Sequence, residues 1–169
     1  LFHAIFDDAD VSDARFGGAY LFGANLINTR ALRADFAGAH LKDILMEGID
    51  LSGGSMRGCY AFRGVFSGAR LVGTDLSGAD LTGAAAENAD FSGAKLGGTK
   101  LLGATLRFAV FKDADMAGAD LANADVVVHG SRGGRLGTAL AAGDLDADGQ
   151  PELVVGAPYE GHLPSGATY

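Results

Sequence analysis

The stretch TDLSGADLTGAAAENADFSGAKL, residues 74–96, has an apolar residue at every fifth position. The same spacing runs from Leu1 to Val126 without a slip, and 18 of these 26 positions are Leu or Phe. The residue two positions before them is usually small, and 17 of the 25 such positions from 4 to 124 are Ala. A period of five fits neither a helix, with about 3.6 residues per turn, nor a strand, with about two. It predicts a chain that turns a corner every five residues.

Repeats of this kind resemble the pentapeptide-repeat proteins. The resemblance implies an all-β fold: a right-handed quadrilateral β-helix with four pentapeptides in each coil. The large residue and the small residue two before it would then point inward, and residues 1–128 would form this domain. At ~20 residues per coil and ~4.8 Å between coils, we expect about six coils and a rod roughly 30 Å long. Cys59 stands at a small inward position, and we interpret it as a buried substitute for Ala.

Residues twenty positions apart stack in this register, so the outward side chains sort into four faces. Opposite charges alternate along two of the faces, which is a favourable arrangement between neighbouring strands. We interpret both rows as structural. They read Asp10, Arg30, Asp50, Arg70 and Asp90 on one face, and Arg15, Asp35, Ser55, Asp75, Lys95 and Asp115 on the other.

A third face is aromatic over its first three coils and polar beyond them. Exposed aromatic side chains gathered on one surface are typical of a binding site. The alternative is that the stacked rings only stabilise the edge of the coil. The candidate partner-binding patch consists of Tyr20, Phe22, His40, Tyr60 and Phe62, and the same face carries Phe2 and Lys42.

The family resemblance also implies an alternative function, since some pentapeptide-repeat proteins imitate duplex DNA and bind DNA gyrase. The fourth face is the most acidic, with Asp7, Asp8, Glu47, Glu87 and Asp125 beside Arg107. However, residues 1–128 hold 16 acidic and 11 basic residues, interleaved by sign. Duplex DNA of the same length would carry on the order of 18 phosphates. A DNA-mimicking inhibitor or protector of gyrase is therefore the alternative function, and the main expectation is a protein-binding scaffold.

Residues 44–66 keep the spacing but lose the usual small residues. Ile44 and Ile49 are larger than Ala, whereas Gly54 and Gly64 are smaller. This exchange of volumes predicts a kink or a bulged coil, and a binding notch is the less supported alternative.

The repeat stops after Val126, and a Gly-rich connector, residues 129–135, leads to the segment AGDLDADGQPELVVGAP, residues 142–158. Its alternating carboxylates suit Ca²⁺, which prefers hard oxygen ligands. The flanks TALAA and ELVVG are strand-like, which predicts a calcium-loop β-hairpin instead of an EF-hand. The expected ligands are Asp144, Asp146, Asp148, the main-chain carbonyl of Gln150, and Glu152.

Residues 136–169 resemble one FG-GAP repeat, the blade unit of integrin-α-type β-propellers. The resemblance rests on Leu136-Gly137, on the acidic loop, and on Gly156-Ala157-Pro158. Glu152 stands where the family usually has Asp. A propeller needs at least about four blades, so we expect either a fragment whose propeller lies downstream or a hairpin left as a cap on the last coil.

The composition excludes several classes of function. A net charge of −8 argues against direct binding of nucleic acid, and no apolar run approaches the ~20 residues that insertion into a membrane requires. The four His residues are scattered, and we expect no catalytic residues. Weak calcium loops favour the outside of the cell. We therefore expect a rod-like, non-catalytic scaffold that is part of a larger extracellular or cell-surface protein. If the chain is instead a DNA mimic, we expect a cytoplasmic protein. Its partner would be a protein, with coil ends available for self-association.

Overall fold

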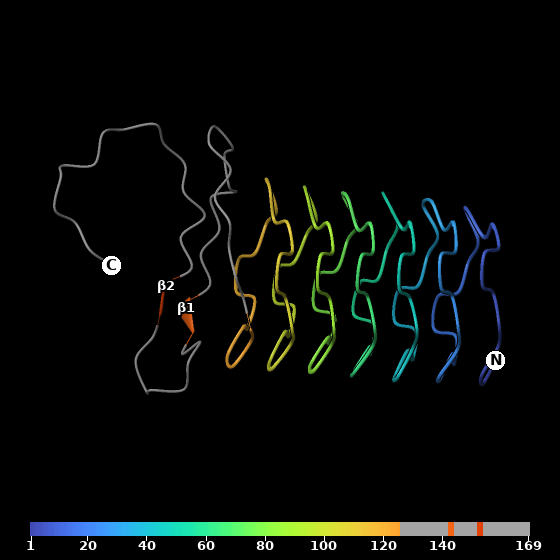
Figure 1. Cartoon of the computed structure of the whole chain (residues 1–169), viewed down its shortest axis with the longest axis horizontal. Coiled ribbons are helices and arrows are strands. Elements are labelled where there is room, and N and C mark those ends of the chain that lie inside the picture. Colours follow the sequence, from blue (N-terminus) through green and yellow to red (C-terminus); the bar gives the residue numbers. More distant parts are fainter. Residues whose placement is uncertain (126–141, 144–151, 154–169) are drawn as a thin grey trace, which may run out of the picture.

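The computed structural model describes residues 1–125, 142–143 and 152–153 (Figure 1). Residues 1–125 wind into coils that stack one beside the next along a single axis (Figure 1). Parallel bridges join every fifth residue to the residue twenty positions later, from Ile5 with Asn25 to Thr105 with Asp125. The twenty-residue register that the family resemblance implies is therefore confirmed, and this part of the chain is an all-β solenoid.

The repeat formed by residues 75–79 shows how each unit satisfies its backbone. Asp75 N donates to the previous coil, and Leu76 N and Gly78 N donate to the next coil. Ala79 N closes a turn on Leu76 O at 2.9 Å. The remaining donor, Ser77 N, is bound by the carboxylate of Asp75 at 3.0 Å. Every N–H of the unit thus has an acceptor, as a closely packed backbone requires.

The capping carboxylate explains why Asp so often precedes the large residue. An Asp side chain that accepts from the N–H two residues on replaces a missing backbone acceptor. The same bond is made at Asp10, Asp35, Asp50, Asp80, Asp90, Asp115 and Asp120.

The corner of each repeat requires a left-handed residue. The third residue of the turn has a positive φ, for example 67° at Gly78, as in a type II turn. Glycine adopts this conformation without steric cost, and Asn or Asp at a small one. Arg63, with φ 57°, and Phe108, with φ 60°, adopt the same left-handed conformation although they are neither Gly nor Asn or Asp.

The core runs along the axis of the solenoid. Every central residue from Leu21 to Leu106 is at most 2% exposed. The small inward position is filled mainly by Ala, and by Thr at three buried places whose hydroxyls donate to a carbonyl of the preceding coil. These are Thr29, Thr74 and Thr99. The interior is thus apolar, and the hydroxyls of its three buried Thr residues are satisfied.

The coil through residues 44–66 is regular, so the predicted bulge is wrong. The bridges Leu45–Val65 and Asp50–Arg70 keep the twenty-residue spacing. The volumes compensate locally. A Cβ on Gly54 would lie 2.6 Å from Leu51 Cδ1, and one on Gly64 would lie 2.7 Å from Phe66 Cε2. Each glycine leaves room for its large neighbour, so the core keeps its density.

Two short strands are described beyond the solenoid. Strand β1 (Ala142–Gly143) pairs antiparallel with β2 (Glu152–Leu153), with Ala142 opposite Leu153 and Gly143 opposite Glu152. This pairing lies at the inner ends of the two segments predicted to be strands.

Within the described ranges, no helix is both long and apolar enough to cross a membrane.

Candidate functional site

Three rings stack on the outside of the first coils. Tyr20 and His40 have centroids 4.4 Å apart and planes 3° apart, and His40 and Tyr60 are 5.1 Å and 15° apart. The rings stand at bridged positions of adjacent strands, so the strand spacing itself sets a stacking distance. Stacking covers the ring faces and leaves the edges outward, because Tyr20 and Tyr60 stay 56% and 55% exposed.

A second row runs beside this stack, two residues further along each coil. Phe2 and Phe22 lie 6.0 Å apart, and the Lys42 ammonium sits 5.9 Å from the centroid of the Phe22 ring. Phe62, the next member, is 40% exposed. A cation at this distance from a ring face is attracted by the ring quadrupole. The second row is therefore aromatic with one embedded positive charge.

The structure brings together all five residues predicted for the aromatic patch. Two of them, Phe22 and Phe62, flank a residue that the prediction left out of the site, Lys42. The twenty-residue register was sufficient to find it, because it places Lys42 between the two Phe residues. We call the two rows together, Tyr20–His40–Tyr60 and Phe22–Lys42–Phe62, the aromatic face.

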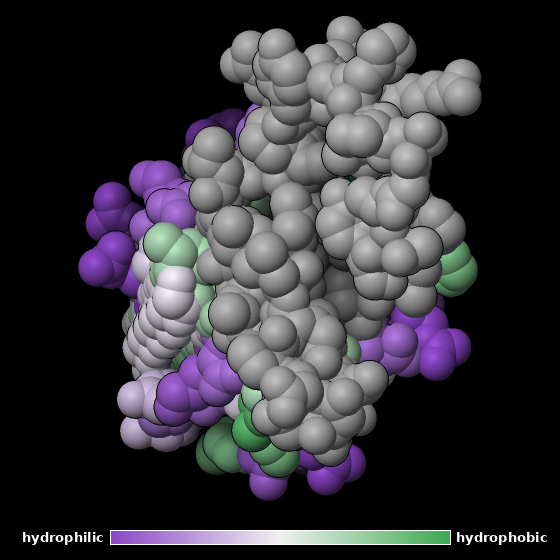
Figure 2. All heavy atoms as spheres, turned by 90° about the vertical axis from the view of Figure 1, so that its left-hand side faces the viewer, coloured by the Kyte–Doolittle hydropathy of each residue, from purple (hydrophilic) through white to green (hydrophobic). Residues whose placement is uncertain are grey.

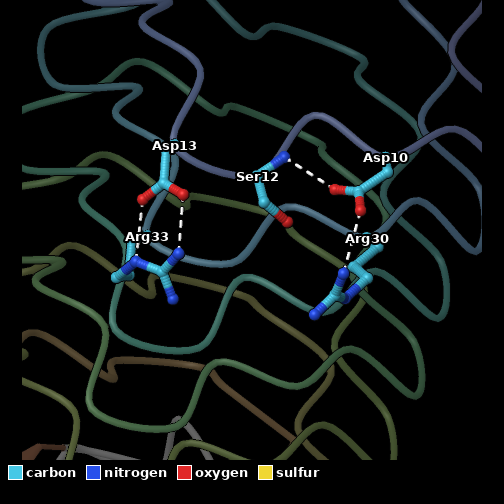
Figure 3. A network of polar contacts seen from close by, with 5 residues as sticks. All are labelled: Asp10, Ser12, Asp13, Arg30 and Arg33. Carbon is cyan, nitrogen blue, oxygen red and sulfur yellow. Dashed lines mark hydrogen bonds and ion pairs between the residues drawn. The ribbon is translucent and has the colours of Figure 1, made fainter.

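The first predicted charge row forms ion pairs between successive coils. Arg30 Nη1 lies 2.9 Å from Asp10 Oδ2, and Arg70 Nε lies 3.8 Å from Asp50 Oδ2. Beside it, Arg33 binds Asp13 with two hydrogen bonds of 2.7 and 2.6 Å (Figure 3). Exposed pairs of this kind contribute little individually. Their arrangement supports the interpretation of the row as structural.

Two of these carboxyls are more acidic than usual. The pKa of Asp10 is lowered to about 2, first by its contacts with Ser12 and then by the Arg30 guanidinium. Ser12 Oγ itself is buried and has no partner among the described residues. The donor that we hold responsible is therefore Ser12 N, at 2.9 Å from Asp10 Oδ1 (Figure 3). The hydrogen bonds from Arg33 lower the pKa of Asp13.

The second charge row pairs differently from the prediction. The backbone ladder runs through Arg15, Asp35, Ser55, Asp75 and Lys95 as expected. The ion pair of Asp75, however, is with Arg57 at 3.7 Å. Arg57 lies in the preceding coil, at the corner that follows Ser55, and is therefore not a member of the row. Ser77 is the main reason that the pKa of Asp75 is lowered.

On the face predicted to be the most acidic, one carboxylate is paired with a base and another accepts a neutral hydrogen bond. Arg107 Nε donates to Asp125 Oδ2 at 2.6 Å, and Asn25 donates to Asp7 at 2.8 Å. Seen from the end of the solenoid, hydrophilic groups project at several places around the rim (Figure 2). The described charges are thus spread over several faces.

No metal-binding cluster is found in the part of the chain that the structure describes. No group of three or more His, Cys, Asp or Glu side chains converges there to hold a metal ion. Cys59 is buried, and burial raises the pKa of its thiol to about 12. This supports its interpretation as an inert core residue.

The predicted calcium ligands fall mostly outside the described residues. Asp144, Asp146, Asp148 and Gln150 lie there, and of the set only Glu152 is described, as a backbone position in β2 paired with Gly143. The set of ligands therefore stays a prediction.

The family follows from the repeats themselves. The family description for pentapeptide repeats, in eight copies, matches residues 4–43, 14–53, 65–98 and 89–126. The chain belongs to the pentapeptide-repeat family. In this pentapeptide-repeat protein, the FG-GAP repeat description matches residues 136–169 as well, so both predicted families are confirmed.

Several solved pentapeptide-repeat structures are similar to this chain. Rfr23 from the cyanobacterium Cyanothece 51142 is 21% identical over 76% of this chain and 90% of its own, with a TM-score of 0.36. The protein alr5209 from Nostoc Pcc 7120 is 27% identical over 55% of this chain and 70% of its own, also with a TM-score of 0.36. QnrB1, a plasmid-mediated fluoroquinolone resistance protein, is 20% identical over 81% of this chain and 88% of its own, with a TM-score of 0.30.

No curated protein matches the chain. The match to the pentapeptide-repeat description establishes the family of the chain.

Proposed function

We propose that this chain is a non-catalytic, rod-like scaffold that binds a protein partner on the outside of its solenoid. The observation that carries the proposal is the aromatic face, where Tyr20 and Tyr60 are more than half exposed beside an apolar row. Exposed aromatic side chains gathered on one surface are typical of an interaction site. Behind the first row, the N–H groups of Leu21, His40 and Leu41 bind carbonyl groups of neighbouring coils, which fixes the backbone that carries these side chains.

The finer architecture belongs to the same proposal. Four pentapeptides per coil give a right-handed quadrilateral β-helix of about six coils. The C-terminal repeat would be a calcium-stabilised hairpin, with Ca²⁺ held by Asp144, Asp146, Asp148, Gln150 O and Glu152. The chemistry of this set fits the ion, since three closely spaced carboxylates supply the hard oxygens that Ca²⁺ takes. The antiparallel pairing of β1 and β2 across the loop supports the hairpin.

A calcium loop that needs a high free concentration of the ion favours the extracellular side. We therefore place the scaffold in a secreted or cell-surface protein. The calcium in it would have a structural role, since ligands drawn from a single tight loop hold its two strands together.

The DNA-mimic alternative receives no support from the pattern of charges. A mimic presents a continuous surface of negative charge in place of phosphates. Here carboxylates of one coil form ion pairs with Arg or Lys side chains of the next coil. The carboxylates are Asp10, Asp13, Asp43, Asp50 and Asp80. The likeness to QnrB1 concerns the fold.

A supercoiling assay with purified DNA gyrase separates the two functions. We expect the whole chain to leave the rate of supercoiling unchanged up to about 10 µM, a concentration at which even a modest specific complex would form. Inhibition at low micromolar protein, or protection of gyrase against a fluoroquinolone, would overturn the scaffold proposal in favour of the mimic.

A further inference from the structure

The charged side chains of the solenoid cancel on three of its four faces. On each of these faces the Arg and Lys residues are as many as the Asp residues. The matched sets are Asp10, Asp50 and Asp90 with Arg30, Arg70 and Lys112; Asp35, Asp75 and Asp115 with Arg15, Arg57 and Lys95; and Asp80 and Asp120 with Lys42 and Lys100. The fourth face carries Asp7, Glu47 and Glu87 over five coils without a base. Most of the net negative charge of the solenoid therefore lies on this face and on Asp8 at its corner.

Apolar side chains alternate with the carboxylates on this face. In every second coil an apolar residue stands two positions before an acid, as Ile5 does before Asp7 and Leu45 before Glu47. Ile5 is 75% exposed and Leu45 is 36% exposed, so these residues belong to the surface and not to the core. We call two bridged rows the acidic–apolar face: Ile5–Asn25–Leu45–Val65–Ala85 and, two residues further along each coil, Asp7–Ile27–Glu47–Ser67–Glu87.

The carboxylates of the acidic–apolar face are not neutralised by bases of residues 1–125. Asp7 accepts hydrogen bonds from neutral donors, Asn25 Nδ2 at 2.8 Å and Ile27 N at 3.0 Å. The two Glu residues of the face take part in no ion pair among the described residues, and the pair that Arg107 forms with Asp125 lies in the coil beyond them. A positively charged partner would therefore meet carboxylates that no base of the solenoid holds.

We propose that the acidic–apolar face binds a basic, amphipathic helix of a protein partner. Charge complementarity gives the sign of the partner, and the spacing of the acids gives its conformation. The acids stand two coils apart, about 9.6 Å. Residues i and i+7 of a helix lie on one side of it, about 10.5 Å apart. An extended strand reaches about 10 Å in three residues, where its side chains point to opposite faces, so it does not fit this spacing.

The apolar side chains specify the rest of the helix. With Lys or Arg at i, i+7 and i+14 opposite Asp7, Glu47 and Glu87, the residues at i+3, i+4, i+10 and i+11 lie on the same side of the helix. Apolar residues at these positions would pack on Leu45 and Val65. The long stems of Lys and Arg absorb the small difference between the two repeats. A helix of about 15–18 residues spans the five coils.

The borders of the face leave room for this helix. The corner beside the acids carries Gly48 and Gly68, and a Cβ on Gly68 would meet no atom within 4 Å. At the other border, Arg63 is paired with Asp43 at 3.5 Å, so its guanidinium does not compete for the acids of the face. This corner separates the acidic–apolar face from the aromatic face. The inference therefore adds a second binding surface to the function proposed above and does not depend on the first.

The spacing also distinguishes this face from a DNA mimic. Duplex DNA carries one phosphate for about every 1.7 Å of its axis, whereas one carboxylate stands here in about 9.6 Å, with apolar residues between. On such a surface, apolar contact holds the partner and the charges fix its orientation and speed its approach.

A designed helical peptide of about 18 residues tests the inference. It carries Arg at i, i+7 and i+14 and Leu at the positions beside them, and its fluorescence anisotropy is followed as the whole chain is added. We expect a Kd on the order of 10 µM in about 50 mM salt, and about tenfold weaker binding in about 0.5 M salt, which screens exposed charge pairs. The control peptide has the same composition, with its Arg residues on the opposite side of the helix. It should bind at least about tenfold more weakly.

Substitutions locate the binding site. Leu45→Ser should raise the Kd about tenfold because an apolar contact is lost, and Glu47→Gln should raise it about threefold because one exposed charge pair is lost. Asp113→Asn is the charge-matched control, since it removes one carboxylate at another corner, where Asn tolerates the φ of 56°. Phe62→Ser is the control for the aromatic face. Both controls should leave the Kd unchanged, and circular dichroism of every variant checks that the solenoid is folded.

Four outcomes overturn the inference. These are the absence of binding up to about 1 mM chain, equal affinity for the two peptides, equal effects of Glu47→Gln and Asp113→Asn, and a loss of affinity in Phe62→Ser instead of Leu45→Ser. The last outcome would place the peptide on the aromatic face. The scaffold function is judged separately, by inhibition or protection of gyrase.

Discussion

Single glycines act in two different ways in this solenoid. At the corners, Gly78 and its equivalents have φ near +65°, a conformation in which any Cβ is strained. Gly54 and Gly64 have no positive φ, and their role is to leave volume for Leu51 and Phe66. The repeat pattern shows the first role directly. The second depends on which way a neighbouring side chain leans, so only the three-dimensional structure shows it.

Gly54→Ala should destabilise the solenoid through overpacking. The new Cβ would lie 2.6 Å from Leu51 Cδ1 and 2.7 Å from the backbone oxygen of Ala34, which cannot move aside easily. We expect the free energy of unfolding in urea to fall by about 1–3 kcal/mol. Gly17→Ala is the matched control, because its Cβ would meet only ordinary contacts at 3.5 Å or more. It should be neutral or raise stability by about 0.4–1 kcal/mol, and an equal loss in both variants would refute the packing argument.

The acidic carboxyl of Asp10 predicts the dependence of stability on pH. Its pKa falls from 3.8 to about 2 on folding, so the folded chain holds fewer protons than the unfolded chain between these values. The stabilisation is complete above about pH 4 and is lost as the pH falls toward about 2. Urea midpoints measured across this window should therefore decline, and the decline should be smaller in Asp10→Asn.

The control for this titration is Asp8→Asn. Asp8 lies in the same coil, and its side chain makes no ion pair or hydrogen bond within the described residues. Asn is compatible with its φ of 56°. We expect this variant to keep the pH dependence of the original chain. A decline that is the same in Asp10→Asn as in the original chain would show that other carboxyls carry the acid sensitivity.

The element of this fold is the pentapeptide, and each unit is complete only with its neighbours. Unit 75–79 makes one turn bond and one capping bond internally, and its other three N–H groups reach the coils before and after it. This dependence explains how much the sequence could predict. The period of five predicts a corner every five residues. The inward positions and the coil length followed from the family resemblance, and the alternation of Asp10, Arg30 and Asp50 agrees with that length.

What the sequence could not give depends on rotamers and on neighbours. Residues 44–66 were expected to form a kink or a bulged coil because the individual volumes change. Instead, the register is kept, and Gly54 and Gly64 leave room for Leu51 and Phe66. The aromatic face was found by its register, whereas the placement of Lys42 over Phe22 depends on how its side chain bends. The ion pair of Asp75 with Arg57 joins a residue of a charge row to a residue at the adjacent corner. Sorting residues by their twenty-residue spacing alone does not predict such a contact.

The hairpin element can be tested through its metal. If Asp144, Asp146 and Asp148 hold Ca²⁺, titration calorimetry of the whole chain should show one site with a Kd on the order of 0.1–1 mM, as expected for extracellular loops. Asp146→Ala should abolish the heat of binding, because a central ligand is lost. Asp90→Ala, which removes a capping carboxylate in the solenoid, is the control and should leave it unchanged. No binding at millimolar Ca²⁺ would contradict the proposed loop.

The whole solenoid behaves as a one-dimensional stack, in which each coil is stabilised by the coil on either side. Interior central residues are at most 2% exposed from Leu21 to Leu106, whereas Leu1 is 63% exposed and Phe6, Phe16 and Phe111 are only partly buried. In such arrays, stability is approximately a sum of unit and nearest-neighbour terms. The end coils therefore have fewer stabilising contacts than the middle ones.

Native-state hydrogen exchange followed by mass spectrometry should show this gradient. We expect the slowest amides in residues 40–90 and faster exchange in residues 1–20, because an interior coil opens only by breaking its pairing on two sides. Leu76→Ala, which empties a fully buried position and costs about 2–5 kcal/mol, should accelerate exchange most strongly in the coils next to it. Equal protection of all coils, or acceleration spread evenly over residues 1–125, would mean that the solenoid opens as one cooperative block. In that case the end coils would be held by contacts that the stacking of neighbours does not supply.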